Sequence, residues 1–251
     1  MEKGINVCLK PCVKMRFNTF LPGVENQIAV NLLKVLSEDT AAHPLTVLVG
    51  HPGCGKTHLA NALALRIQKR TKLKVGLTNG RRFVDSVVRA YQHKKFEALS
   101  KELLALDVLI FDDFDTLSGK SRSQEVLLDF MREAEHIGKS LVFTVSRSNL
   151  PCFDWQNDSL RARIADATPI ALRHPGRSTL ETMMRHEAGR RGVILGDAEL
   201  DLLFGRCRIT SQRGVEGLLT VLNAYSRWLG TPIDAPLIDA LSAVWDKCDA
   251  A

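Results

Sequence analysis

Five short apolar runs recur between residues 45 and 172, and a polar or glycine-containing turn follows each of the first four. The runs occupy residues 45–49, 75–78, 108–111, 141–144 and 169–172. Continuous apolar runs of this length are typical of parallel strands that are covered on both faces. Between them, the apolar positions of 58–69 and 121–136 recur at helical spacing. This alternation predicts an α/β fold, with a parallel sheet flanked by helices.

After Pro175-Gly176 the pattern becomes helical only. Four helical segments are predicted, beginning at or near Ser178, Asp197, Thr210 and Pro236. The spacing Ser178-x-x-Glu181 is typical of a capping box at the start of the first of them. We therefore expect three parts, namely an N-terminal tail (1–14), an α/β domain (15–175) and a small all-helical domain (176–251).

Composition places the chain among ordinary globular proteins. It has 251 residues, of which 45% are apolar and 25% charged, so disordered and collagen-like classes do not fit. No apolar run approaches the ~20 residues that cross a bilayer, and the first ten residues lack the apolar core of a secretory signal. These features predict a soluble, cytoplasmic protein with no membrane partner.

The positive charge is concentrated in one segment. The whole chain carries a formal charge of +6, yet residues 66–95 alone contain ten basic residues against a single acid, Asp85. Such a segment binds a polyanion or forms a solvated basic face, and composition alone slightly favours the solvated face.

One segment matches the phosphate-loop pattern G-x-x-x-x-G-K-[ST], directly after the first apolar run and directly before a helical pattern. Glycines let backbone N–H groups surround a phosphate, and the helix N-terminus adds partial positive charge. Lys56 is expected to reach the β- and γ-phosphates of a nucleotide, and the Thr57 hydroxyl to bind Mg²⁺. The predicted nucleotide contacts are Gly50, Pro52, Gly53, Cys54, Gly55, Lys56, Thr57 and His58.

Acidic and hydroxyl side chains follow two further strands. Asp112 and Asp113 end the third apolar run, where the first would hold Mg²⁺ and the second would orient or deprotonate the attacking water. Thr144 and Ser146 end the fourth run, where a polar side chain would lie between the γ-phosphate and that water. The sequence thus predicts a hydrolytic site that uses ATP and Mg²⁺.

Several motifs, in this order, make the chain resemble the AAA+ module of the bacterial replication initiator DnaA family. They are Phe17-x-x-Phe20-x-x-Gly23, Gly55-Lys56-Thr57-His58-Leu59, Arg82-Phe83-Val84, Asp112-Asp113-x-x-x-Leu117-x-Gly119-Lys120, Leu160-Arg161-x-Arg163 and Arg213-x-x-Glu216-Gly217. The resemblance runs from about Met15 to about Trp228. It implies a P-loop AAA+ sheet domain that binds ATP or ADP with Mg²⁺ and carries a small helical lid.

The resemblance also implies roles for individual residues. Phe20 and Gly23 match the segment around the adenine, although Phe17 and Phe20 are equally well explained as core aromatics. Arg163 matches the arginine finger that acts across a subunit interface, and Arg213 matches the lid arginine that senses the nucleotide. The positions that match contacts with single-stranded DNA are Val84, Lys120 and Arg122.

The chain departs from the family at several points. The family usually has aspartate where this chain has Ser146, which puts the rate of hydrolysis in question. We recognise neither the family's C-terminal helix-turn-helix unit nor its N-terminal partner domain, nor the clamp-binding peptide of Hda-type regulators. The expected function is therefore an ATP-controlled accessory or regulator of replication initiation that self-assembles through Arg163 and binds a DnaA-type initiator or a replicative helicase. The alternatives are a helicase loader or transposition helper of DnaC or IstB type, and a small-molecule P-loop phosphotransferase.

Overall fold

A parallel sheet of five strands forms the centre of the larger part of the chain. The computed structural model describes residues 7–248. The strands are β1 (Leu45–Gly50), β2 (Val75–Asn79), β3 (Val108–Asp112), β4 (Ser140–Ser146) and β5 (Thr168–Leu172). Their order across the sheet is β2-β3-β4-β1-β5, and all neighbours run parallel. The predicted α/β fold with a parallel sheet is confirmed.

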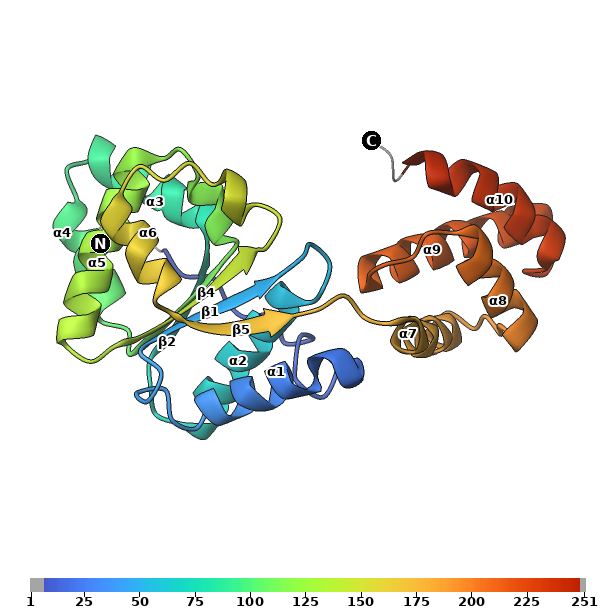
Figure 1. Ribbon diagram of the computed structural model, residues 1–251, viewed down its shortest axis with the longest axis horizontal. Coiled ribbons are helices and arrows are strands. Elements are labelled where there is room, and N and C mark those ends of the chain that lie inside the picture. The colour runs from blue at the N-terminus through green and yellow to red at the C-terminus, as the bar shows by residue number, and fades with distance from the viewer. Residues whose placement is uncertain (1–6, 249–251) are drawn as a thin grey trace. The chain divides into compact units, whose positions relative to one another are not determined.

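The helices cover both faces of this sheet (Figure 1). One face carries α1 (Gly23–Leu36) and α2 (Lys56–Arg70). The other face carries α3 (Gly80–Gln92), α4 (Phe96–Leu104), a short 3₁₀ helix η1 (Phe114–Leu117), α5 (Ser121–His136) and α6 (Asp158–Ala165). Helices α2 and α5 match the two stretches of helical apolar spacing predicted from the sequence, whereas α1, α3, α4 and α6 were not predicted.

Successive residues of the strands alternate between two apolar cores. Phe111 and Phe143 belong to the core under α3–α6, whereas Ile110 and Val142 belong to the core under α1 and α2. This double burial explains why the strands read as continuous apolar runs. The 3₁₀ helix η1 contributes Phe114 to the core under α3–α6, where its ring stacks on Phe153 with ring centroids 5.2 Å apart.

Residues of the predicted N-terminal tail pack along the outer edge of β2. Leu9 forms an isolated antiparallel bridge with Leu77, and its N–H donates to the Leu77 carbonyl at 2.6 Å. Val7 is fully buried, and its carbonyl accepts a hydrogen bond from the Thr78 hydroxyl at 2.8 Å. The part of the tail that the structure describes therefore belongs to the α/β unit.

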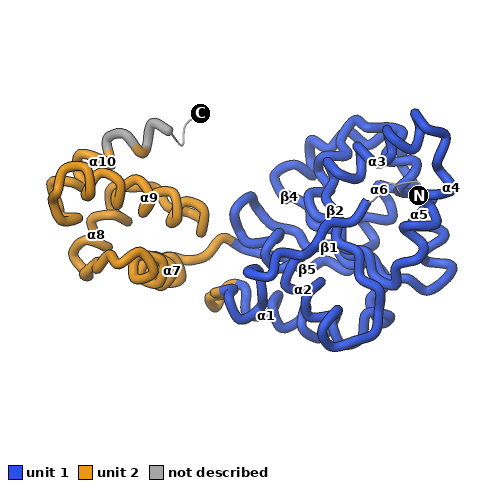
Figure 2. The backbone as a smooth tube through the Cα atoms, turned by 180° about the vertical axis from the view of Figure 1, so that it is seen from behind, with its two compact units in different colours: residues 1–20, 26–173 blue, residues 21–25, 174–251 orange. Residues whose placement is uncertain are grey.

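The chain divides into two compact units (Figure 2). The α/β unit comprises residues 1–20 and 26–173, and the second unit comprises residues 21–25 and 174–251. The helices of the second unit are α7 (Arg177–Arg190), α8 (Asp197–Arg206), α9 (Gln212–Leu229) and α10 (Ala235–Cys248). They enclose a separate apolar core that includes Leu203, Leu218 and Ile238. None of the helices among residues 7–248 is both long and apolar enough to cross a membrane.

The predicted capping box at Ser178 is wrong. Helix α7 begins at Arg177, and its N-cap is Gly176, which supplies no side-chain cap. The Glu181 carboxylate instead pairs with Arg177, one turn earlier, at 2.7 Å. The Glu25 carboxylate accepts the Gly176 N–H at 2.7 Å and the Thr179 hydroxyl at 3.2 Å, so a residue distant in sequence stabilises the start of this helix.

Candidate nucleotide-binding site

The turn between β1 and α2 tolerates only glycine at two points. Gly55 has φ of +103°, and a Cβ atom there would meet the Phe20 ring at 2.5 Å. A Cβ atom on Gly50 would meet Cys54 Sγ at 2.5 Å and the Leu172 carbonyl oxygen at 2.9 Å. Helix α2 starts after Gly55 without a side-chain cap. Its first N–H groups therefore keep the direction and the partial charge that bind a phosphate.

Lys56 is a buried cation at the centre of this turn. Its side chain is largely enclosed, with 8% of the residue exposed. The ammonium group donates to the Gly50 carbonyl at 2.8 Å and to the His51 carbonyl at 3.0 Å. Pro52 is exposed, and Gly53 has φ of +80°. A buried ammonium held by the loop's own carbonyls fits a site for anionic oxygens.

Asp112 lies beside this loop because β3 and β4 are paired in register. Phe111 pairs with Phe143, which places Asp112 next to Thr144. The Thr144 hydroxyl donates to Asp112 Oδ1 at 2.6 Å and accepts the Asp113 N–H at 2.9 Å. Burial raises the pKa of Asp112, while hydrogen bonds from Thr144 and from the Thr57 hydroxyl lower it. Hydroxyl groups from α2 and β4 therefore both bind the buried carboxylate of Asp112 at the end of β3.

Thr57 and Asp112 fit a magnesium ion that is shared with nucleotide phosphates. Within residues 7–248, no group of three His, Cys, Asp or Glu side chains could hold a metal by itself. Mg²⁺ in phosphate sites is commonly held by one or two protein oxygens, substrate phosphates and water. The buried Asp112 carboxylate and its hydroxyl partner Thr57 provide such oxygens. A cation there would offset the burial that raises the pKa of Asp112.

Of the two residues predicted to end the fourth strand, Ser146 does so, whereas Thr144 lies two residues earlier. β4 extends to Ser146, so Thr144 lies inside the strand, fully buried, and its hydroxyl holds Asp112. Ser146 is 5% exposed, with its Oγ 3.0 Å from Ser148 Oγ. Its N–H donates to Asp115 Oδ2 at 2.7 Å. Asp113 is exposed, with φ of +53°.

Phe20 and His58 pack together over the first turn of α2. Their ring centroids are 5.3 Å apart, and Phe20 is 7% exposed within the core under α1 and α2. His58 Nε2 lies 2.9 Å from the Arg16 carbonyl, and burial lowers the pKa of this imidazole. The structure therefore places Phe20 both in the core and against the glycine of the phosphate loop.

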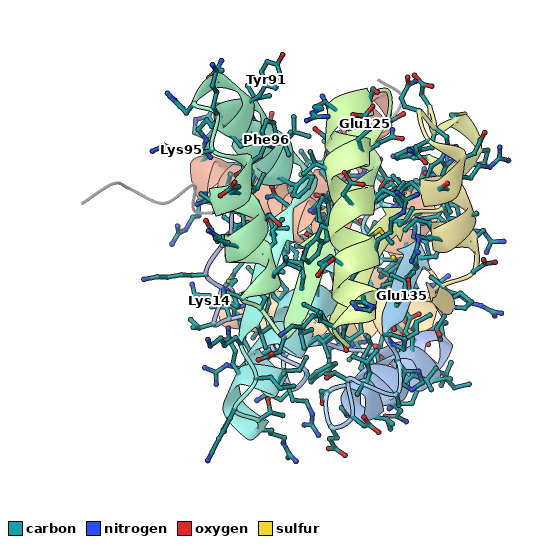
Figure 3. All side chains as sticks on the ribbon, turned by 90° about the vertical axis from the view of Figure 1, so that its left-hand side faces the viewer. Lys14, Tyr91, Lys95, Phe96, Glu125 and Glu135 are labelled. Atoms are coloured by element: carbon teal, nitrogen blue, oxygen red, sulfur yellow. The ribbon has the colours of Figure 1, made fainter. Side chains whose placement is uncertain are left out.

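Arg163 lies on α6, a helix whose start is capped by Asn157. Its side chain is 32% exposed and forms an ion pair with Glu135 near the end of α5. Figure 3 shows Glu135 and Glu125 towards opposite ends of α5. An arginine that is partly exposed and held by a single surface carboxylate remains accessible to another subunit.

Two of the predicted contacts, Arg213 and Gly23, belong to the second unit. Arg213 is exposed at the second position of α9, just after the Ser211 cap. Gly23 has φ of +54°, and a Cβ atom there would meet Thr179 Oγ1 at 2.2 Å. Close packing within the second unit therefore requires glycine at position 23.

One of the predicted DNA contacts, Arg122, lies on an aromatic and basic surface of α3, α4 and α5. The Arg122 guanidinium lies 5.0 Å from the centroid of the Phe96 ring and pairs with Glu125 at 3.0 Å. Tyr91 is 66% exposed, and its ring lies 6.1 Å from that of Phe96. Figure 3 shows Tyr91, Lys95, Phe96 and Glu125 at the same end of the unit. Lys120, two residues before Arg122, is exposed, and Val84 is half-buried against the core.

The basic segment also lines an open cavity on α3. The cavity has a volume of about 640 Å³. Its lining includes Arg81, Arg82 and Arg89, with Asp85 as the single acid. This arrangement locates part of the charge of residues 66–95 on one helix.

A family model described as the bacterial DnaA ATPase domain matches residues 12–167. The chain belongs to the bacterial DnaA ATPase-domain family. The DnaA of Psychromonas ingrahamii, a chromosomal replication initiator protein, is 28% identical over 232 residues, covering 91% of this chain and 50% of that protein. The chain thus spans about half the length of the curated DnaA proteins it matches.

Solved DnaA structures share the fold. Domain III of the Thermotoga maritima DnaA superposes with a TM-score of 0.81 at 20% identity, covering 94% of this chain and 99% of that one. A DnaA bound to AMPPCP and single-stranded DNA superposes with a TM-score of 0.75 at 20% identity, covering 85% of this chain and 66% of that one. The AAA+ architecture is therefore that of DnaA domain III.

Within this DnaA fold, the structure reveals two polar residues that sequence reasoning missed. Asp115 accepts a hydrogen bond from the Ser146 N–H at the end of β4, and Glu135 forms an ion pair with Arg163. A third acid three positions after Asp112 was a visible signal for Asp115. Glu135 had no such signal, because its pairing depends on how α5 and α6 pack.

Proposed function

We propose that this chain is a nucleotide-controlled AAA+ protein that binds ATP with Mg²⁺, hydrolyses it, and assists or regulates the initiation of DNA replication. It would act by assembling with a DnaA-type initiator or a replicative helicase. The convergence of buried Lys56 with the Thr57 and Asp112 pair at one edge of the sheet carries this proposal. Membership of the DnaA ATPase-domain family supports it further.

The site divides the chemistry among its residues. The N–H groups at the start of α2 and the Lys56 ammonium would bind the phosphates, while Thr57 and Asp112 would hold Mg²⁺. Asp113 would accept a proton from the attacking water, because it is exposed directly after the metal-binding Asp112. The nucleotide would then act as a switch, because an assembly that prefers ATP over ADP is released by hydrolysis.

Co-purification with each candidate partner in ATP and in ADP tests this function. The tagged chain is mixed with the initiator or the replicative helicase from the same cells, and complexes are separated by size-exclusion chromatography. We expect a complex in ATP that is lost in ADP with one of the two partners. Equal elution in both nucleotides with both partners would contradict a nucleotide-controlled assembly.

The ion pair between Glu135 and Arg163 would restrain Arg163, the predicted arginine finger, before assembly. Removing the carboxylate with Glu135→Gln should therefore ease ATP-dependent assembly. Because exposed ion pairs contribute about 0.2–1 kcal/mol, the midpoint concentration for assembly should fall by at most about five-fold. Analytical ultracentrifugation across a concentration series measures this midpoint. Glu133→Gln is the matched control, since Glu133 is an exposed carboxylate on the same helix. A weaker assembly in Glu135→Gln would mean that Glu135 supports the interface directly.

We propose further that the surface around Arg122 contacts single-stranded DNA in the assembled state. The solved relative with single-stranded DNA has the same fold, and this surface combines exposed cations with aromatic rings. Aromatic rings stack on bases, and cations track the phosphate backbone. The Phe96 ring and Glu125 hold the Arg122 guanidinium in place, which reduces the entropy lost on binding.

Arg122→Ala should weaken single-strand binding more than Arg70→Ala. The two arginines form a matched pair, because their side chains are 58% and 57% exposed and each pairs with a glutamate. Losing one phosphate contact should lower the slope of log affinity against log salt by about 1. Fluorescence anisotropy of a labelled oligonucleotide with ATP and with ADP, across a salt series, measures this slope. Equal losses in both variants would indicate a nonspecific basic surface.

A further inference from the structure

Asp115 carries a carboxylate beside the phosphate loop that the family motifs leave without a role. It lies in η1, three residues after Asp112. Its Oδ2 accepts the Ser146 N–H at 2.7 Å. Its Oδ1 is buried, and among the described residues it has no hydrogen-bond partner. A buried acceptor without a partner costs about 1–3 kcal/mol, so a carboxylate kept in this state needs an explanation.

The backbone around Asp115 is fixed from both sides. Phe114 and Leu117 are fully buried, and Phe114 contacts Phe143 and Phe153 in the core under α3–α6. The Thr116 N–H donates to the Asp113 carbonyl at 3.2 Å and closes the turn. The backbone on either side of Asp115 is therefore held by the core and by the turn.

A short chain of contacts links Asp115 to the cation of the phosphate loop. Ser146 pairs with Gly50 across β4 and β1, and the Gly50 carbonyl accepts the Lys56 ammonium at 2.8 Å. Burial raises the pKa of Asp115, whereas the Ser146 N–H and the Lys56 charge lower it and Asp113 raises it. Asp115 thus interacts electrostatically with the phosphate-binding lysine and with the residue proposed as base.

We propose that Asp115 orients the water that attacks the γ-phosphate, by turning its unpartnered Oδ1 towards that water when a nucleotide occupies the site. In the reaction, the water oxygen bonds to the γ-phosphorus, the bond to the β–γ bridging oxygen breaks, and its electron pair leaves with ADP. The water proton passes to Asp113, while Asp115 accepts a hydrogen bond from the other O–H. This inference rests on the proposed ATPase function. Asp115 would thereby supply a carboxylate at the end of β4, where this chain has the uncharged Ser146.

Asp115→Asn tests this role with two measurements. The amide keeps an oxygen for the Ser146 N–H but removes the negative charge. Calorimetry with ADP and with the slowly hydrolysed analogue AMPPCP gives the ratio of their dissociation constants. Because one negative charge near the γ-phosphate is lost, AMPPCP should bind about three- to ten-fold tighter relative to ADP. Single-turnover hydrolysis of ATP should slow by about 10²-fold.

Asp129→Asn is the matched control, because it removes one negative charge from a carboxylate that is 77% exposed on α5. Its binding ratio and its hydrolysis should equal those of the wild type. Thermal unfolding shows whether Asp115→Asn is folded, and Asp115→Glu serves as the second variant if it is not. An unchanged binding ratio in a folded variant overturns the role of Asp115 while leaving the proposed function intact. A wild type that binds neither nucleotide overturns both.

Discussion

Lys56→Ala should lose most of the affinity for ATP while the fold stays intact. The Lys56 ammonium is buried at the loop and donates to the Gly50 and His51 carbonyls, so it is already placed for anionic oxygens. Charged hydrogen bonds contribute about 1.5–3 kcal/mol each, and two of them to the β- and γ-phosphates correspond to a loss of about 10²-fold or more. Isothermal calorimetry with ATP measures the change.

Lys69→Ala is the control for this variant. Lys69 lies on the same helix but is exposed in its last turn, so its removal should leave ATP affinity unchanged. Circular dichroism and thermal unfolding establish that both variants are folded. Wild-type affinity in folded Lys56→Ala would remove the phosphate-loop interpretation, since no other buried cation is placed at this loop in residues 7–248.

The sheet and the phosphate loop could be predicted because their signals are local. Strands buried on both faces require consecutive apolar residues, and the loop is marked by one contiguous pattern from Gly50 to Thr57. Helix α3 was not predicted, although its buried residues Phe83, Val87 and Ala90 recur at helical spacing.

The contacts that hold the site together could not be predicted in the same way. Thr144 meets Asp112 only because β3 and β4 are neighbours in a particular register. The sequence shows neither strand order nor register, so it predicts Thr144 at a strand end facing the γ-phosphate and not its bond to Asp112. The false capping box at Ser178 has a similar origin. A local pattern suggested a local cap, whereas the stabilising carboxylate of Glu25 comes from 151 residues away.

Arg163→Ala should abolish ATP turnover by the assembled protein without changing the ATP affinity of the monomer. A finger stabilises the transition state on a neighbouring subunit's nucleotide, and such arginines contribute about 10³–10⁵-fold to turnover. Arg163 is 32% exposed and bound only to Glu135 among the ion pairs of the described residues, which leaves it free to act in this way. Arg161→Ala, an exposed arginine on the same helix, is the control.

Mixing two inactive variants decides whether Arg163 acts across an interface. Asp113→Asn should bind ATP and assemble but lack the base, while it still carries Arg163. Arg163→Ala should retain the base and the phosphate loop. In a head-to-tail assembly formed from equal amounts, about a quarter of the interfaces would join an intact site to an intact finger, so the mixture should recover about that share of wild-type turnover. If Arg163 instead acted on the nucleotide of its own subunit, every subunit in the mixture would lack one group, and turnover would stay at the level of the separate variants.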